Sequence, residues 1–334
     1  MTNRNNQTGL ADDGIEAVLR RAAPRPAPPA EDEHAIREAV RAEWQAVVRE
    51  RKRSSRTRYF ALAASMLVAI AIAFTMLGSP RVDTPAVAQI DKSVGAIYLL
   101  GDRAELVELA DIETVAAGQA IQTGDGAALG LVMTNGGSLR IDENTRVEFR
   151  NSETVYLQRG RLYFDSAGGE TTLVIETDHG SVTHLGTRYM AASGDDALIV
   201  SVREGRVRVD GRYYDETAGA GVQLAFRGSA RPVSVNLPAW GGAWSWAEAM
   251  APGIDLSGRS ADEFLQWVAR ETGFAIEYAD ADAERVAKEA MLRGSVETDP
   301  RTALRLRMMT TDLVYEFVPD RGAIVIRLGG SAAP

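Results

Sequence analysis

The 334-residue sequence contains no cysteine and only three histidines, His34, His179 and His184. The absence of cysteine excludes disulfide bonds, thiolate metal ligands and cysteine nucleophiles. His179 and His184 supply two metal ligands at most, and no third ligand is evident near them. The sequence also lacks phosphate-binding, dinucleotide-binding and serine-nucleophile motifs and a recognisable carboxylate pair. We therefore expect no metal site, no bound cofactor and no turnover enzyme.

Long uncharged apolar runs are also scarce, and the single one extends from Tyr59 to Gly78. About 20 residues at 1.5 Å each match a hydrocarbon core of about 30 Å, which predicts a transmembrane helix over residues 59–78. Six Lys and Arg residues lie between positions 49 and 58, and Arg81 is the only base shortly after the run. Positive flanks stay in the cytoplasm, so we expect a cytoplasmic N-terminus and a C-terminal body across the membrane. The alternative is a signal peptide cleaved after Ala88, but the preceding segment is long for one.

Charge is distributed unevenly between the two sides of this run. Residues 1–58 contain 12 Lys or Arg and 9 Asp or Glu, a net charge of +3, whereas the whole chain carries −9. The rest of the chain therefore carries about −12. An acidic body disfavours nucleic-acid binding.

The segment of residues 1–58 is expected to contain one amphipathic helix over about residues 31–53. Its apolar residues recur at spacings of three and four and form one stripe, which a lone helix cannot bury. In a first interpretation the helix dimerises or lies on lipid head groups. In a second interpretation it docks a cytoplasmic partner. We favour the second interpretation, with Trp44 as the anchor, because interfaces favour large aromatic side chains. The expected partner-binding residues are Ile36, Val40, Trp44 and Val47.

Residues 90–228, after an expected linker at 79–89, show the pattern of many short strands. Apolar residues alternate with polar ones, as in Leu129, Leu131 and Met133, and glycine-containing turns separate the runs. No stretch sustains a helical period. We expect an all-β domain, either a sandwich or a short β-solenoid.

The C-terminal part begins with a Trp/Gly hinge at 229–250 and continues with a small α/β domain at 251–330. Ser260 and Glu263 form a predicted capping box for a first helix, and Asp299 caps a second. Alternating apolar residues after each helix predict a strand. This order indicates two helices on one face of a sheet.

Five motifs follow one another in the β domain: Gly118–Gly124, Gly137–Asp142, Gly160–Asp165, His184–Tyr189 and Val202–Val207. Taken in order, they resemble the motifs of the FecR family. The resemblance implies a single-pass inner-membrane regulator of an extracytoplasmic-function sigma factor, with a periplasmic C-terminus and an anti-sigma role. The C-terminal part, through the segments Ile254–Ser260, Arg293–Val296 and Ile324–Arg327, is similar to the short domain at the N-termini of secretins and TonB-dependent receptors.

The resemblance also implies partners and a reaction. The cytoplasmic partner is the sigma factor, and the outer partner is commonly the signalling domain of a TonB-dependent receptor. Some family members cleave themselves at a Gly-Thr bond, and Gly186-Thr187 preserves that dipeptide. The alternative is that Gly186 is an ordinary turn glycine and Thr187 an ordinary strand threonine, and that neither takes part in a reaction.

Two other functions remain open. A membrane-tethered scaffold would bind protein or glycan through the β domain and have no transcriptional output. An envelope hydrolase would lose activity when one carboxylate or histidine is changed.

Overall fold

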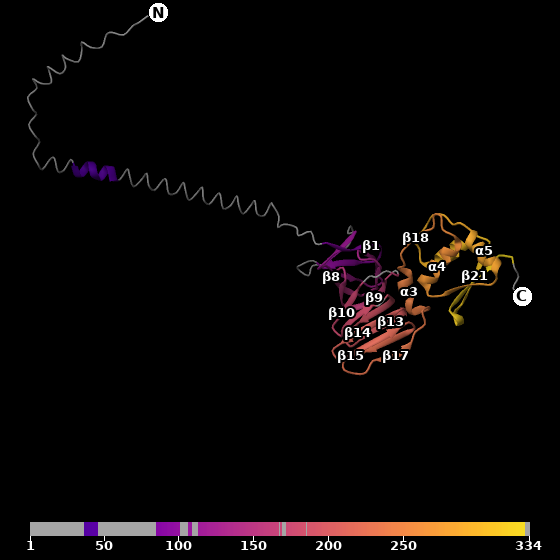
Figure 1. Ribbon diagram of the computed structural model, residues 1–334. Coiled ribbons are helices and arrows are strands. Elements are labelled where there is room, and N and C mark those ends of the chain that lie inside the picture. The colour runs from indigo at the N-terminus through magenta and orange to yellow at the C-terminus, as the bar shows by residue number, and fades with distance from the viewer. Residues whose placement is uncertain are drawn as a thin grey trace, which may run out of the picture. The chain divides into compact units, whose positions relative to one another are not determined.

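The structure is a computed structural model that describes residues 37–45, 85–100, 106–108, 113–166, 168, 172–184 and 186–330. The chain divides into two compact units, Met1–Val82 and Asp83–Pro334. In the first unit, residues 37–45 form a helix (Figure 1). The expected transmembrane run at residues 59–78 lies outside the described residues, and no helix within them is long and apolar enough to cross a membrane.

The first part of the second unit consists of strands and contains no helix among its described residues up to Phe226, as the sequence predicts (Figure 1). β1 begins at Ala86, so the strand pattern starts inside the expected linker at 79–89. The strands are β1 (Ala86–Val94), β2 (Ile97–Leu100), β3 (Leu106–Glu108), β4 (Thr114–Ala116), β5 (Ala120–Thr123), β6 (Ala128–Met133), β7 (Ser138–Ile141), β8 (Arg146–Asn151), β9 (Thr154–Asp165), β10 (Val174–Thr177), β11 (Gly180–His184), β12 (Arg188–Ser193), β13 (Leu198–Glu204), β14 (Arg206–Gly211), β15 (Tyr214–Gly219), β16 (Val222–Phe226) and β17 (Val233–Asn236).

These strands pair into two sheets that share the long strand β9. One sheet has the order β4-β1-β6-β7-β9-β12-β13-β16-β17, and the other has the order β3-β2-β5-β8-β9-β10-β11-β14-β15. The β9–β10 pair is parallel and the other pairs are antiparallel. The domain is therefore a two-sheet sandwich, in which the chain crosses repeatedly from one sheet to the other.

Gly160 is the point at which β9 leaves one sheet for the other. Its φ is +96°, and a Cβ atom there would lie only 2.5 Å from the Cα atom of Thr145. Only glycine fits this combination of positive φ and close backbone approach. The Gly160–Asp165 motif therefore begins at a bend that the fold requires.

The core of the β domain lies between the two sheets. Leu129 and Leu131 from one sheet and Val147 and Phe149 from the other are fully or almost fully buried in one continuous cluster. The alternation that predicts these strands thus corresponds to side chains that point inward, which confirms an all-β domain.

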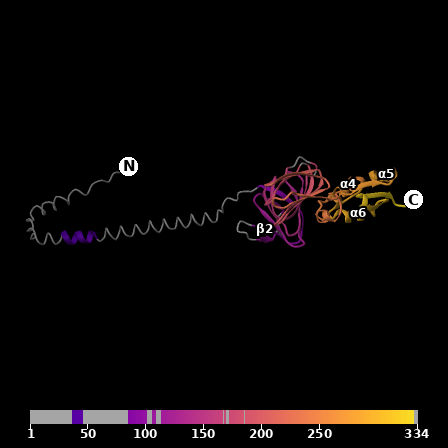
Figure 2. The same cartoon turned by 90° about the horizontal axis from the view of Figure 1, so that it is seen from below.

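The C-terminal α/β domain follows, and its three main helices lie at one end of the unit, beyond the strands of the β domain (Figures 1 and 2). Its main sheet has the order β19-β22-β21, with β19 and β22 parallel and β21 and β22 antiparallel, and β18 pairs with β20. The elements are β18 (Ile254–Asp255), α4 (Ala261–Thr272), β19 (Ala275–Tyr278), α5 (Ala281–Glu289), β20 (Ser295–Val296), α6 (Pro300–Met308), β21 (Leu313–Val318), η2 (Pro319–Arg321) and β22 (Ala323–Leu328).

Both predicted helices of this domain are present, and a third one is added. The Ser260 capping box and the Asp299 cap are formed. The sequence prediction lacks α5, because its buried face is made by Ala283 and Ala287, which form no conspicuous apolar stripe.

The segment at 229–250, expected as a Trp/Gly hinge, contains β17, η1 (Gly242–Trp244) and α3 (Ser245–Ala249). Trp244 is fully buried, and its ring centroid lies 6.1 Å from that of Tyr163 in the β domain. Burial of such a large side chain fixes this part of the segment against the sheet.

Candidate functional site

The predicted partner-binding stripe is partly visible on the helix of residues 37–45. Val40 and Trp44 are four residues apart, which places them on one side of the helix, and they are 61% and 69% exposed. Ile36 and Val47 lie outside the described residues. Within the unit that carries it, the helix therefore presents an indole side chain to solvent.

The Gly186-Thr187 pair forms the turn between β11 and β12. Gly186 is exposed with a φ of +72°, whereas Thr187 is 2% exposed. The amide N–H of Ser166 donates to the Thr187 carbonyl oxygen over 3.2 Å. The Thr187 hydroxyl is buried and has no hydrogen-bond partner among the described residues. A threonine hydroxyl thus lies in a dry environment beside the peptide bond that precedes it.

Gly205 closes this turn from the opposite side. Its φ is +78°, and a Cβ atom there would lie 2.7 Å from Thr187 Cγ2 and 3.2 Å from the carbonyl carbon of Gly186. The structure therefore brings together two sequence motifs, His184–Tyr189 and Val202–Val207.

His184 is buried near this turn but is unsuited to act as a base. Its Nε2 atom accepts a hydrogen bond from the Leu173 amide over 3.0 Å, so the neutral ring carries its proton on Nδ1. Nδ1 has no partner in the described part of the chain, and burial lowers the pKa of this histidine. The ring packs against Phe164 with the centroids 4.9 Å apart. His184 is thus a neutral core residue of the β domain.

The two histidines have different surroundings. His179 Nε2 lies 2.7 Å from the carbonyl oxygen of Gly194, which engages that nitrogen. Among the described residues, no group of three or more His, Cys, Asp or Glu side chains is arranged to hold a metal ion.

A buried ionic cluster joins the β domain to the α/β domain. Arg203 donates to the carbonyl oxygens of Ala239 and Glu271 over 2.6 and 2.9 Å and to the Glu248 carboxylate over 3.2 Å. Arg140 donates to the Glu271 carboxylate over 2.6 Å. These four charged residues are each at most 4% exposed. Each buried charge therefore has an opposite charge beside it, as burial requires.

Sequence reasoning does not find this cluster, because its members are far apart along the chain. A signal was present, since Arg140 lies between Leu139 and Ile141 in one strand, Arg203 follows Val202 in another, and each belongs to a family-like motif. An arginine in an inward-facing strand position must have a buried partner.

The end of α4 contacts the β domain beside the Gly186-Thr187 turn. Arg188 donates to the carbonyl oxygen of Arg270 and, through Nε, to the Glu204 carboxylate over 2.7 Å. The Arg270 guanidinium lies 2.5 Å from an Asp165 carboxylate oxygen. The α/β domain therefore reaches the residue that follows Thr187.

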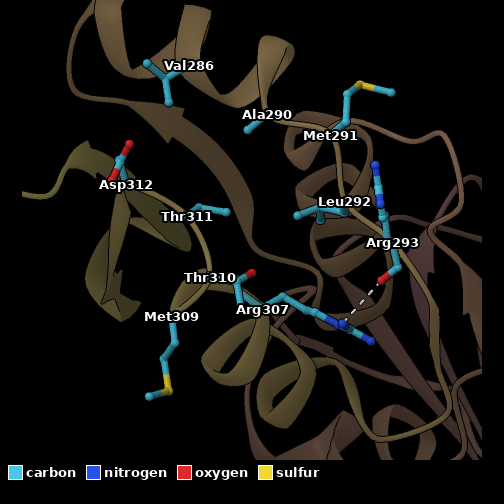
Figure 3. Close-up of a pocket in the computed structure, with 10 residues that line it drawn as sticks. All are labelled: Val286, Ala290, Met291, Leu292, Arg293, Arg307, Met309, Thr310, Thr311 and Asp312. Carbon is cyan, nitrogen blue, oxygen red and sulfur yellow. Dashed lines mark hydrogen bonds between the residues drawn. The ribbon is translucent and has the colours of Figure 1, made fainter.

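A groove of about 610 Å³ lies on the α/β domain between α5 and the end of α6 (Figure 3). Val286, Leu292 and Thr311 are among the residues that line it. Met291 and Met309, labelled in Figure 3, are 60% and 80% exposed. The groove therefore combines a mixed polar and apolar lining with exposed flexible thioethers, which suits contact with another molecule.

Comparison with known proteins places part of this chain in a family. Residues 119–208 match the family model described as FecR protein. This segment is a FecR domain. It runs from the start of β5 into β14 and includes Gly160, Gly186, Thr187 and Gly205, so the FecR resemblance of the sequence is confirmed over this range. The family match supports a role in sigma-factor regulation.

Solved structures add a distant likeness. Two crystal structures of a proposed anti-sigma factor from Parabacteroides distasonis ATCC 8503, at 1.65 and 2.50 Å resolution, share 17% and 18% identity with this chain. The matches cover 62% and 63% of this chain and 97% and 98% of the other, with TM-scores of 0.35 and 0.33. No curated protein sequence matches the chain. The assignment therefore rests on the FecR family match.

Proposed function

We propose that this protein is a single-pass inner-membrane regulator of anti-sigma type, which relays a periplasmic signal to an extracytoplasmic-function sigma factor. The observation that carries the proposal is the FecR domain at residues 119–208. The apolar run at 59–78 and its basic N-terminal flank support a cytoplasmic N-terminus and a periplasmic body. Fusion of alkaline phosphatase after residue 330 tests the topology, since the enzyme is active only outside the cytoplasm.

The cytoplasmic helix is the proposed output of the regulator. Exposed Val40 and Trp44 offer an apolar stripe into which a sigma-factor groove can pack. In this account, the interface also includes Ile36 and Val47. The tethered-scaffold alternative assigns no output to the helix, so a sigma-dependent reporter that ignores a Trp44→Ala change would favour the scaffold.

The α/β domain is the proposed receiver of the outer signal. β21 pairs only with β22, so in the described part of the chain its other edge is open for an added strand. Exposed Met309 lies shortly before this strand, at the groove of Figure 3, and Val314 within the strand is 49% exposed. We propose that a signalling domain of a TonB-dependent receptor docks on this surface.

Self-cleavage at Gly186-Thr187 is a second proposed activity. The Thr187 oxygen attacks the Gly186 carbonyl carbon, the peptide C–N bond breaks, and the hydroxyl proton passes to the nitrogen; water then hydrolyses the ester. The buried, unpartnered Thr187 hydroxyl beside the positive-φ Gly186 favours this activity over a purely structural turn. Purified protein should resolve into two fragments on a denaturing gel, whereas the Thr187→Ala variant should remain one band. One intact band for both proteins would exclude the reaction.

A further inference from the structure

Arg270, on the last turn of α4, lies between two residues of the β domain that face each other across a pair of strands. Asp165 of β9 and Arg188 of β12 are partners in the antiparallel register. The Asp165 carboxylate contacts the Arg270 guanidinium over 2.5 Å, and the Arg188 guanidinium donates to the Arg270 carbonyl oxygen. Both the side chain and the backbone of Arg270 are therefore tied to the end of the same strand pair.

The same strand ends hold the Gly186-Thr187 turn in place. Ser166, the residue after Asp165, donates its amide to the Thr187 carbonyl over 3.2 Å. Arg188, the residue after Thr187, pairs with Glu204, whose neighbour Gly205 lies against the turn. Ser166 is thus next to Asp165, which Arg270 contacts, and Gly205 is next to Glu204, which is linked to Arg270 through Arg188.

We propose that Arg270 is a positioning residue for the Gly186-Thr187 bond, so that the α/β domain completes the site in the FecR domain. This inference rests on the proposed self-cleavage. An acyl shift requires the Thr187 oxygen to stay close to the Gly186 carbonyl carbon, and small displacements from such a geometry lower rates steeply. Arg270 touches neither reacting atom. It acts through Asp165 and Arg188, whose positions set those of the turn.

Removal of the Arg270 side chain is a local change. Its guanidinium side chain is 40% exposed and lies 4.0 Å from Glu271 Oε1 as well as beside Asp165, whereas the Arg140–Glu271 and Arg203–Glu248 pairs are buried and have their own contacts. The Arg270→Ala variant should therefore keep the two domains together while it loosens the turn.

The first measurement is a time course of fragment formation by the full-length chain in detergent. We expect Arg270→Ala to slow cleavage by about tenfold, and Arg270→Lys to restore part of the rate because it keeps a cation beside Asp165. Arg285→Ala is the matched control, since Arg285 on α5 also forms exposed helix ion pairs, with Asp282 and Glu289. It should cleave at the wild-type rate.

The second measurement is amide hydrogen exchange in a Thr187→Ala background, in which no cleavage occurs. The Ser166 amide reports the turn directly, because its acceptor is the carbonyl oxygen of residue 187. We expect Arg270→Ala to accelerate its exchange at least severalfold, with unchanged exchange in β6 and β13. Arg285→Ala should leave the Ser166 exchange as it is.

The two measurements separate the possible failures. Unchanged Ser166 exchange overturns the positioning role, whatever the gel shows. Faster exchange with an unchanged cleavage rate also overturns it, because the loosened turn would still react. If the wild-type chain never cleaves, the self-cleavage proposal is overturned. Faster Ser166 exchange in Arg270→Ala would then still support the link between Arg270 and the turn.

Discussion

The Arg140 guanidinium lies 2.6 Å from the Glu271 carboxylate, although the two residues are 131 positions apart. Arg140 belongs to β7 of the FecR domain and Glu271 to the last turn of α4. Both side chains are buried, at 1% and 5% exposure. The α/β domain is thus fixed to the FecR domain through a desolvated ion pair rather than through a flexible connection.

We predict that Arg140→Met destabilises the protein by about 3–5 kcal/mol, because it leaves the Glu271 carboxylate buried without its partner. The measurement is chemical denaturation of wild type and variant. Arg285→Ala, which removes exposed ion pairs, is the control and should change the free energy of unfolding by at most about 1 kcal/mol. Equal stability of the Arg140→Met variant and wild type would show that the pair does not hold the domains.

Gly205→Ala should destabilise the FecR domain by at least about 1–3 kcal/mol, because the new Cβ atom would overlap the Gly186-Thr187 turn at a positive φ. Gly219→Ala is the control, since nothing lies within 4 Å of a Cβ atom there and its φ is not positive. Thermal unfolding of both variants checks the prediction. A Gly205→Ala variant as stable as Gly219→Ala would contradict the close packing of the turn.

His184 should make stability depend on pH in the mildly acidic range. Burial lowers its pKa below the ordinary 6.5, so the unfolded chain binds a proton at a higher pH than the folded chain. The contribution of neutral His184 to the free energy of unfolding should be complete above about pH 6.5 and should be lost as the pH falls below that value. Unfolding at pH 7.5 and 5.5 measures this loss.

Substitution of His184 by glutamine separates this effect from other titrating groups. His184→Gln keeps an acceptor for the Leu173 amide but has no proton to gain, so the loss between pH 7.5 and 5.5 should shrink. The His179→Gln variant is the control for a histidine-to-glutamine change elsewhere in the β domain. The same pH dependence in His184→Gln and wild type would exclude His184 as the source.

Met309→Lys should silence signalling without affecting the fold. Met309 is 80% exposed, so its replacement should change the free energy of unfolding by less than about 0.5 kcal/mol. If the groove of Figure 3 receives the outer partner, a buried lysine charge there would weaken docking strongly. Tyr213→Lys, at a 60% exposed aromatic position of the β domain, is the control. Equal reporter output from both variants in inducing conditions would exclude this surface.

Local sequence patterns predicted the individual elements well, because burial on one face leaves a period in the sequence. Alternation identified β6, whose Leu129, Leu131 and Met133 are all buried. The Ser260 capping box placed the start of α4 correctly. Such signals involve residues a few positions apart, so the chain itself displays them.

Long-range relationships could not be predicted in the same way. The pairing of Arg140 with Glu271 and the contact of Gly205 with Thr187 depend on which strands become neighbours. The packing of Trp244 on Tyr163 is a third such pair. No spacing in the sequence encodes these pairs, although an arginine in a strand marks one partner of the first pair and a glycine at positive φ marks one partner of the second.

Co-purification of sigma factors with the full-length chain tests the central claim most directly. Wild type, Trp44→Ala and Glu38→Ala are purified from cells in detergent, and bound proteins are identified by mass spectrometry. Glu38 lies on the side of the same helix away from Val40 and Trp44, so its variant controls for changes in helix stability. We predict that wild type and Glu38→Ala retain an extracytoplasmic-function sigma factor and that Trp44→Ala loses it. Absence of a sigma factor from all three would contradict the regulatory account.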